Sequence, residues 1–547
     1  MIFAVMAMLA AVVGIGIAKA DFKGTAQRKR DIESTRGAKR RRAEFSQCAL
    51  HFHCVKLYHN RPCDVKLDCL FNEIKSHPRK AKQSQYAIIY STMKWTIYNI
   101  LFLIIYPFLL PGFLLRMLKR GGYAARFGDR FALYPDDVLE KLGRRESLSD
   151  SHNPSPSQFV WIHAVSVGEV QVAGQLMREW RKADESVRFC FSTTSSTGWK
   201  MAEREVSASD VLIYNPLDFP TFVRAALQTV RPRAVVLVES EIWPNFIRRA
   251  AKDKIPVFLI NARVSDRSAP RYRKAKWFFK DIFSLFTHIF AQSELDRDRL
   301  IAAGAPREIV EVTGSFKFDV AKRMPEKEAI LSSWISMSLG EDESSETKKR
   351  KLILGGSTWP GEDEILISIY SNLLSKSKGD SPAPILAIAP RHFEKADAVE
   401  ENIRRAGFDC IRRSRGECKA TSGSARPPVL LADTTGELMG LYQLADIVFV
   451  GKSLSAHGSQ NMIEPCLCGK VTLVGPHTEN FRPVMSDLLA ADAVVQVSSA
   501  EELEEKIFKF ASNRTEAAEL GERAAKAVEA RCGVVKRCTA AIMEALK

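Results

Sequence analysis

The chain of 547 residues is too long for one hydrophobic core, so we expect two domains and additional material. Its hydrophobic content of 46% and charged content of 26% are ordinary for a globular protein. The formal net charge of +16 is uneven, because residues 1–92 hold 17 Lys and Arg against 7 Asp and Glu. Since this excess lies outside the part with regular apolar patterning, it does not indicate a nucleic-acid-binding protein.

The 11 cysteines do not indicate a disulfide framework or a metal site. Four of them lie in residues 1–92 near two histidines, but no C-x-x-C pair is present there, which disfavours zinc. The other seven are scattered and are typical of reduced thiols in a cytosolic protein.

Two apolar segments precede the region of regular patterning. Ile2–Ala18 has no Lys or Arg before it, so it lacks the positive start of a signal peptide. Ile97–Leu115 has no charge over 19 residues, which is close to the length that spans a bilayer. It contains Pro and Gly, which fits either a kinked span or a segment lying in the membrane interface. We therefore predict a membrane anchor at residues 93–121, after a basic extension or mis-called start at residues 1–92.

Three basic residues follow this segment and indicate its orientation. They are Arg116, Lys119 and Arg120. Because positive charge beside an apolar segment favours the cytoplasmic side, we expect the rest of the chain on the cytoplasmic face of the inner membrane. The same residues are candidates for contact with an anionic lipid.

Short apolar runs alternate with amphipathic stretches from residue 159 onward. The runs read FVWIHAV, VRFCFST, DVLIYN, AVVLVE, PVFLIN and HIFAQS, and each ends in polar or small residues. Continuous apolar runs are typical of strands buried on both faces of a parallel sheet. The pattern predicts a doubly wound α/β domain over residues 122–323.

A second set of apolar runs begins after a polar stretch at residues 324–350, which we interpret as a linker or an exposed helix. The runs read KLILGGS, PILAIAP, PVLLAD, DIVFVG, KVTLVG and AVVQV. They predict a second doubly wound domain over residues 351–547. Ligands of such sheets bind outside the carboxyl ends of the strands, so functional residues are expected directly after the apolar runs.

Polar residues occur at these positions in both halves. In the first half they are Ser166, Gly168, Glu169, Glu239 and Glu241. In the second half they are Ser357, Thr358, Arg391, Asn461 and Glu464. Gly355 and Gly356 stand before Ser357, ahead of a helix whose free N–H groups suit a phosphate. No Walker A motif and no G-x-G-x-x-G after an apolar run is present, which disfavours P-loop NTPases and Rossmann dehydrogenases.

Glu169 has two interpretations on its own sequence context. A carboxylate in the first turn of a helix is favoured by the helix dipole. A carboxylate at the end of a buried strand also suits a catalytic base.

Eight ordered motifs resemble one enzyme family. They are WIHAVSVGEV, TTSSTGW, YNPLDFP, ESEIWPN, NARVSDRS, TGSFKFD, APRH and HTENF. In this order they are similar to the 3-deoxy-D-manno-octulosonic acid (Kdo) transferases of lipopolysaccharide assembly, from about Met93 to the C-terminus. The resemblance implies a GT-B glycosyltransferase that transfers Kdo from CMP-Kdo to a lipid A precursor (lipid IVA) and has an N-terminal membrane anchor.

The resemblance also implies roles for individual residues. Glu169 corresponds to the family's general base, and Glu239 or Glu241 would orient the acceptor or the base. Arg391 would meet the CMP phosphate, and Asn461 and Glu464 would bind the nucleotide. Ser357 and Thr358 would contact phosphate or the Kdo carboxylate, and Lys317 would bind the anionic donor. No metal or other cofactor is implied.

Two residues depart from the family pattern. Ser459 stands where the family often has Gly, and Met462 stands where it often has Pro. Because Pro suits the first helical turn, its loss is expected to loosen the nucleotide loop modestly. The alternatives to a Kdo transferase are another GT-B transferase or epimerase that uses a UDP-sugar, and a membrane-tethered nucleotide-binding protein without activity.

Overall fold

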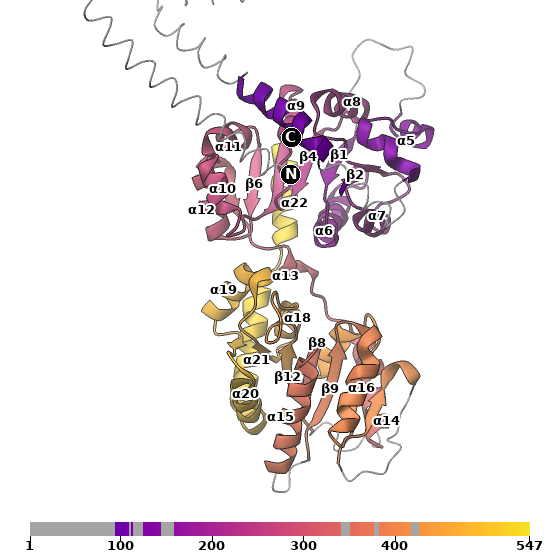
Figure 1. Cartoon of the computed structure of the whole chain (residues 1–547), viewed down its shortest axis with the longest axis vertical. Helices are drawn as coiled ribbons and strands as arrows, with labels where there is room; N and C mark the ends of the chain where they lie inside the picture. The colour runs from indigo at the N-terminus through magenta and orange to yellow at the C-terminus, as the bar shows by residue number, and fades with distance from the viewer. Residues whose placement is uncertain are drawn as a thin grey trace, which may run out of the picture.

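The computed structural model describes residues 93–108, 111–112, 124–143, 158–340, 350–376, 382–416 and 426–547. Within these ranges the chain forms two α/β units, each built on a seven-stranded sheet (Figure 1). The prediction of two doubly wound parallel sheets is confirmed, since the strand pairs of both sheets are parallel. The predictions for residues 1–92 and for Arg116, Lys119 and Arg120 lie outside the described residues.

The first sheet has the strand order β3-β2-β1-β4-β5-β6-β7. Its strands are β1 (Phe159–His163), β2 (Arg188–Thr193), β3 (Val211–Tyr214), β4 (Ala234–Val238), β5 (Val257–Ala262), β6 (His288–Ala291) and β7 (Val310–Val312). Every residue of β1, β4 and β5 is buried, as continuous apolar runs predict. Because β1, β4 and β5 are neighbours and run in parallel, the residues that follow them meet at one edge of the sheet.

The second sheet has the strand order β10-β11-β9-β8-β12-β13-β14. Its strands are β8 (Leu352–Thr358), β9 (Ile385–Pro390), β10 (Cys410–Arg412), β11 (Val429–Leu431), β12 (Ile447–Val450), β13 (Val471–Val474) and β14 (Val495–Gln496). β8 is central, between β9 and β12, so residues at its carboxyl end have neighbours on both sides.

Helices cover both sheets. Those of the first half are η1 (Ala124–Phe131), α5 (Asp136–Lys141), α6 (Val167–Ala183), α7 (Ser196–Ala202), α8 (Pro220–Val230), α9 (Pro244–Lys252), α10 (Ala269–Lys274), α11 (Lys276–Phe283), α12 (Glu294–Ala303) and α13 (Lys317–Val320). Those of the second half are α14 (Pro325–Leu339), α15 (Glu362–Lys376), α16 (Ala396–Arg405), α17 (Leu438–Leu444), α18 (Ile463–Leu467), α19 (Arg482–Ala490), α20 (Ala500–Ser512), α21 (Arg514–Glu529) and α22 (Val534–Ala545).

The chain passes from the first unit to the second at α13. Phe316 is buried in a core cluster of the first sheet, and Phe318 is buried in a core cluster of the second. Residues 324–350, for which a linker or an exposed helix is expected, contain α14 instead. Leu331 and Trp334 of α14 are fully buried in the core of the second unit, because they recur on one face of the helix.

The last helix returns to the first unit. Val534, Cys538 and Ile542 of α22 are buried together with residues of β1 and α6, and Figure 1 shows this helix, in yellow, within the upper unit. Asp319 of α13 accepts hydrogen bonds from the N–H groups of Gly533 and Val535, 2.6 and 2.7 Å away. These bonds join the segment in which the chain leaves the first unit to the segment in which it returns. The expected assignment of residues 351–547 to a single domain therefore does not hold for α22.

Residues 93–108 form a helix that is partly a core element of the first unit. Trp95, Tyr98 and Phe102 are buried, and the Tyr98 hydroxyl donates to Asp218, 3.1 Å away. The opposite face of the helix exposes apolar side chains at residues 100, 103, 104 and 108. Among the residues that the structure describes, no helix is long and apolar enough to cross a bilayer. Residues 113–121 of the predicted anchor lie outside the described residues.

Candidate functional site

The carboxyl edges of the two sheets face each other. Lys317, which follows β7, donates a hydrogen bond from Nζ to the carbonyl of Asn480, which follows β13, at 2.9 Å. Asp266, which follows β5, forms an ion pair with Arg482 of α19. Each of these contacts joins residues beyond the carboxyl ends of strands. The candidate residues of the two units, which follow strands as well, therefore lie on facing sides.

Glu169 stands in the first turn of α6, at the end of β1. Ser166 is the N-cap: its hydroxyl accepts the Glu169 N–H at 3.3 Å and donates to Glu169 Oε1 at 2.9 Å. Glu169 Oε2 accepts the N–H of Val165 at 2.8 Å. This is a capping box, so the first-turn interpretation of Glu169 is correct as far as geometry goes. It also holds the carboxylate in one orientation.

A carboxylate cluster surrounds Glu169. Burial raises the pKa of Glu169, and the negative charges of Glu241 and Glu239 raise it further, while the Val165 N–H opposes the shift. A carboxyl group with a raised pKa accepts a proton more readily. The two interpretations of Glu169 are therefore compatible, because one side chain can cap α6 and still act as a base.

Glu239 and Glu241 follow β4 and differ in their partners. Glu239 Oε2 lies 3.0 Å from Arg263 Nε, and its Oε1 accepts from Asn261 Nδ2 at 3.3 Å. Burial raises the pKa of Glu239, whereas the charges of Arg263 and Lys317 lower it. Glu241 instead accepts from the indole N–H of Trp243 at 2.9 Å. The charges of Arg263 and Lys317 thus partly neutralise Glu239. Glu241 is bonded to a neutral indole group and keeps more of its negative charge.

His163, the last residue of β1, is a further member of this cluster that the sequence analysis does not single out. It is almost completely buried, with Nδ1 2.9 Å from Ser192 Oγ and Nε2 3.6 Å from Glu241 Oε2. The sequence feature that could have indicated His163 is a polar residue inside the apolar run WIHAV. A histidine in such a run is commonly a core residue, and only the contact with Glu241 connects it to the site.

The neighbouring residues leave space beside Glu169. A Cβ added at Gly168 would meet no atom within 4 Å, so the exposed surface of the first turn of α6 is open. Ser195 in the stretch TTSSTGW, in contrast, has a structural role. Ser195 caps α7 and donates to the carbonyl of Val165 at 2.8 Å, which braces the turn that carries Glu169.

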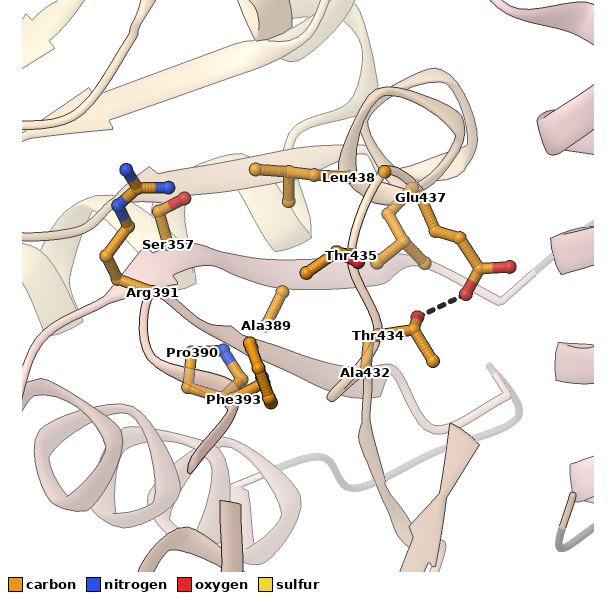
Figure 2. Close-up of a pocket in the computed structure, with 12 residues that line it drawn as sticks. Ser357, Ala389, Pro390, Arg391, Phe393, Ala432, Thr434, Thr435, Glu437 and Leu438 are labelled. Atoms are coloured by element: carbon orange, nitrogen blue, oxygen red, sulfur yellow. Dashed lines mark hydrogen bonds between the residues drawn. The ribbon is translucent and has the colours of Figure 1, made fainter. Parts of the chain in front are cut away.

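The second unit has a cavity of about 180 Å³ at the carboxyl ends of β8, β9 and β11. Its lining includes Ser357, Arg391, Thr434 and Glu437 (Figure 2). Figure 2 shows the Arg391 guanidinium and the Ser357 side chain on the same side of this cavity, with Thr434 donating to Glu437 on the other. The Arg391 side chain is exposed, so a positive charge is available to an anion there.

The glycines before Ser357 serve packing. Gly355 and Gly356 lie within β8, and a Cβ at these positions would meet Leu366 Cδ1 at 2.4 Å and the Tyr442 hydroxyl at 2.6 Å. Their backbone groups are therefore not free at a helix start, as the sequence analysis expects. Thr358 is buried beside them. The first turn of α15 is acidic, which disfavours a phosphate at that helix end.

Glu362 in that turn is fully buried and organises the loop after β12. Its Oε2 accepts the N–H groups of Trp359 and Lys452, both at 2.8 Å. Its Oε1 accepts those of the next three residues, Ser453, Leu454 and Ser455, at 3.1–3.2 Å. Glu362 is not among the residues predicted from the sequence, although a Glu soon after Pro360-Gly361 is a helix-start signal.

Asn461 and Glu464 lie together at the start of α18. Asn461 Oδ1 accepts the Ile463 N–H at 3.0 Å, one residue before Met462, the N-cap of α18. Burial raises the pKa of Glu464, and a hydrogen bond with the Asn461 side chain lowers it. Burial raises the pKa of the Tyr442 hydroxyl, and the negative charge of nearby Glu464 raises it further. Tyr442 packs on Gly356, so Glu464 is near the carboxyl end of β8.

The two departures from the family pattern have different structural consequences. Ser459 has a φ of 52°, a left-handed conformation that favours glycine. Met462 is fully buried in the core of the second unit, with a φ of −90°. The methionine side chain therefore adds core packing at the position where proline would pre-organise the turn.

One group of side chains could hold a metal ion. Within the described part of the chain, His457, His477 and Glu479 are the only three His, Cys, Asp or Glu residues whose ligand atoms all lie within 4.8 Å of one another. They lie in the segments after β12 and β13 of the second unit.

Comparison with known proteins identifies the family. Residues 125–320 match the family model described as 3-Deoxy-D-manno-octulosonic-acid transferase (kdotransferase). The 3-deoxy-D-manno-octulosonic acid transferase of Haemophilus influenzae is 30% identical over 425 residues, which are 77% of this chain and 91% of that protein. The corresponding transferase of Bordetella pertussis is 32% identical over 388 residues, 69% of this chain and 83% of that protein.

One solved structure is also similar to part of this chain. The C-terminal CMP-Kdo binding domain of WaaA from Acinetobacter baumannii is 26% identical and covers 37% of this chain and 96% of that chain, with a TM-score of 0.32. The family assignment depends on the sequence relatives, which cover most of both chains. The chain therefore belongs to the family of the 3-deoxy-D-manno-octulosonic acid (Kdo) transferases, which are glycosyltransferases.

Proposed function

We propose that this chain transfers Kdo from CMP-Kdo to a lipid A precursor, lipid IVA, with Glu169 as the general base. The observation that carries the proposal is the position of Glu169. It combines a fixed orientation in the capping box, a raised pKa, and open space at Gly168. Family membership supports the transferred sugar.

The chemistry is a direct displacement at the anomeric carbon of Kdo. The acceptor oxygen forms a bond to this carbon while the bond from the carbon to the CMP phosphate oxygen breaks. CMP leaves with the bonding electrons, and the acceptor proton passes to Glu169 Oε1 or Oε2. Burial raises the pKa of Glu169, and the like charges of Glu241 and Glu239 raise it further, so taking up this proton relieves their repulsion.

The donor is assigned to the second unit. Arg391 and Ser357, at one side of the cavity, would bind the CMP phosphate or the Kdo carboxylate. Asn461 and Glu464 would bind the nucleotide, and a carboxylate is a good acceptor for ribose hydroxyls. Lys317, which lies beside Glu239 in the connection between the units, would meet the negative charge of the donor from the other side.

The acceptor and the membrane are assigned to the first unit. The helix at residues 93–108 exposes Ile100, Leu103, Ile104 and Phe108 on one face, and Phe108 is 81% exposed. Four large apolar side chains on one helix face suit the acyl region of a membrane interface. We propose that this face attaches the enzyme to the cytoplasmic face of the inner membrane, where a nucleotide sugar and a lipid acceptor meet.

The test is transfer from CMP-Kdo to tetra-acylated lipid A precursor in metal-free buffer. We expect a product whose mass exceeds that of the acceptor by one or more Kdo units. CMP should inhibit the reaction more strongly than UDP. No transfer from CMP-Kdo, together with turnover of a UDP-sugar, would refute the proposal and favour the alternative enzyme class. Binding of CMP without turnover of either donor would indicate an inactive nucleotide-binding protein.

A further inference from the structure

His457, His477 and Glu479 form a side-chain cluster that the proposed transfer reaction does not use. His457 Nδ1 lies 2.9 Å from Glu479 Oε1, and His477 Nδ1 lies 3.7 Å from the same oxygen. The two imidazole rings are 4.1 Å apart between centroids. Their mutual contact brings two imidazole nitrogens and one carboxylate oxygen to one point on the surface.

The spacing of these atoms fits a transition-metal ion. Zn–N and Zn–O bonds are about 2.0–2.2 Å long, so the ligand atoms of a tetrahedral site lie roughly 3.3–3.6 Å apart. The observed separations of 2.9 and 3.7 Å fall on either side of this value. All three side chains are at least partly exposed, so small rotations can adjust them without disturbing a core.

The chemistry of the three ligands favours zinc over magnesium or calcium. Imidazole nitrogen suits zinc and neighbouring transition metals, whereas Mg²⁺ and Ca²⁺ prefer sites made of oxygen alone. Two imidazoles and one carboxylate are a complete protein ligand set for a zinc ion that keeps a fourth position for water.

We propose that His457, His477 and Glu479 bind one Zn²⁺ ion on the donor side of the molecule. The ion joins two loops that bear on the proposed site. His457 belongs to the loop after β12, which leads to Ser459 and Asn461. Glu479 is followed by Asn480, whose carbonyl accepts the hydrogen bond from Lys317. Zinc at this point crosslinks two loops. One is the loop after β12, which leads to Asn461, and the other is the loop after β13, which contacts Lys317.

This site is separate from the expectation that the transfer step needs no metal. Glu169, Glu239 and Glu241 belong to the first unit, and none of them is a ligand of the cluster. Zinc binding is therefore a property of the donor loops, and it can be measured without substrate.

The experiment is equilibrium dialysis of the full-length chain against Zn²⁺, at a pH where histidine is neutral. We compare the wild type with His457→Ala, His477→Ala and Glu479→Gln. Each variant should lose one equivalent of bound zinc or bind that equivalent at least tenfold more weakly. The matched control is His288→Ala. It removes a histidine 3.1 Å from Glu311 that has no third ligand among the residues that the structure describes.

A second readout identifies the ligands and separates this site from the cysteines of residues 1–92. Co²⁺ bound to nitrogen and oxygen ligands in a tetrahedral site absorbs in the visible range without the near-ultraviolet band of a thiolate ligand. We expect this spectrum in the wild type and in His288→Ala, and its loss in His477→Ala. Because the substituted side chains lie on the surface, circular dichroism should be unchanged. Equal zinc stoichiometry and affinity in the wild type and all three cluster variants would overturn the proposal.

Discussion

Lys317 Nζ donates a hydrogen bond to the carbonyl of Asn480 at 2.9 Å, across 163 residues of sequence and between the two units. The ammonium group also lies 4.1 Å from the centroid of the Phe481 ring. Burial lowers the pKa of Lys317, while the charge of Glu239 raises it. This lysine is thus a cation held at the junction by partners from both units.

Replacing this cation should weaken donor binding. We expect Lys317→Ala to raise the KM for CMP-Kdo by about 10- to 100-fold, because a hydrogen bond to a charged group contributes about 1.5–3 kcal/mol. Steady-state kinetics with varied CMP-Kdo measures this effect. The exposed Lys322 provides the matched control, and Lys322→Ala should leave KM unchanged. An unaltered KM in Lys317→Ala would show that Lys317 has no role in donor binding.

The base assignment predicts a specific loss in Glu169→Gln. The kcat should fall by about 10²- to 10⁴-fold, the usual contribution of a positioned general base. Binding of CMP should persist, since Glu169 belongs to the unit opposite the donor cavity. Glu179→Gln is the control on the same helix, where Glu179 pairs with Lys182 on the surface. Full activity in Glu169→Gln would mean that another group takes the proton.

The pH profile should report the carboxylate cluster. Burial and Glu241 raise the pKa of Glu169 above its ordinary value of 4.5. A base works only when deprotonated, so kcat should rise with pH through this raised pKa. In Glu241→Gln one like charge is gone, and the acidic limb of the profile should move to lower pH. If the acidic limb stays at the same pH in Glu241→Gln, the charge of Glu241 does not affect the pKa of Glu169.

The same pKa shift has a consequence for stability. The folded state binds the Glu169 proton more tightly than the unfolded chain does. The contribution of this protonation to the free energy of unfolding is therefore complete below pH 4.5. It is lost as the pH rises through the folded-state pKa. A comparison of chemical denaturation of the wild type and Glu169→Gln at several pH values measures this contribution.

Glu362 should be a structural requirement of the donor loop. In Glu362→Gln the amide can no longer accept all five backbone N–H groups, and buried unpaired donors remain. We expect the free energy of unfolding to fall by on the order of 3 kcal/mol. The control is Glu364→Gln, in the same turn but exposed. Chemical denaturation measures both variants, and equal stability would show that the loop does not depend on the carboxylate.

The backbone at Ser459 predicts a stabilising substitution. A left-handed conformation costs a non-glycine residue about 1 kcal/mol, so Ser459→Gly should raise the free energy of unfolding by up to about 1 kcal/mol. The gain is reduced by the loss of the hydrogen bond from Ser459 Oγ to the Gln460 carbonyl. Ser332→Gly, in the middle of α14, should instead lower stability, because glycine is a poor helix former. A decrease in both variants would contradict the strain argument.

Some of the fold could be predicted because the signal is local. β1, β4 and β5 are continuous apolar runs, and their burial follows directly from composition and length. β7 and β10 are absent from the prediction because each is a three-residue strand that contains a charged residue, VEV and CIR, so neither forms a continuous apolar run. The buried face of α14 was present as an apolar repeat at Leu331, Trp334 and Ile335, but the charged residues after it obscured the pattern.

By itself, the sequence determined that the chain alternates strands and helices, that polar residues follow the strands, and that Glu169 stands between a strand and a helix. These features depend on neighbouring residues only. The tertiary structure decided which distant groups meet: α22 packs on the first sheet, Glu362 collects the N–H groups of a loop some 90 residues away, and Lys317 reaches Asn480. An amphipathic helix does not specify which core will bury it, and a carboxylate does not specify its donors. Only the packing of both units determines these partners.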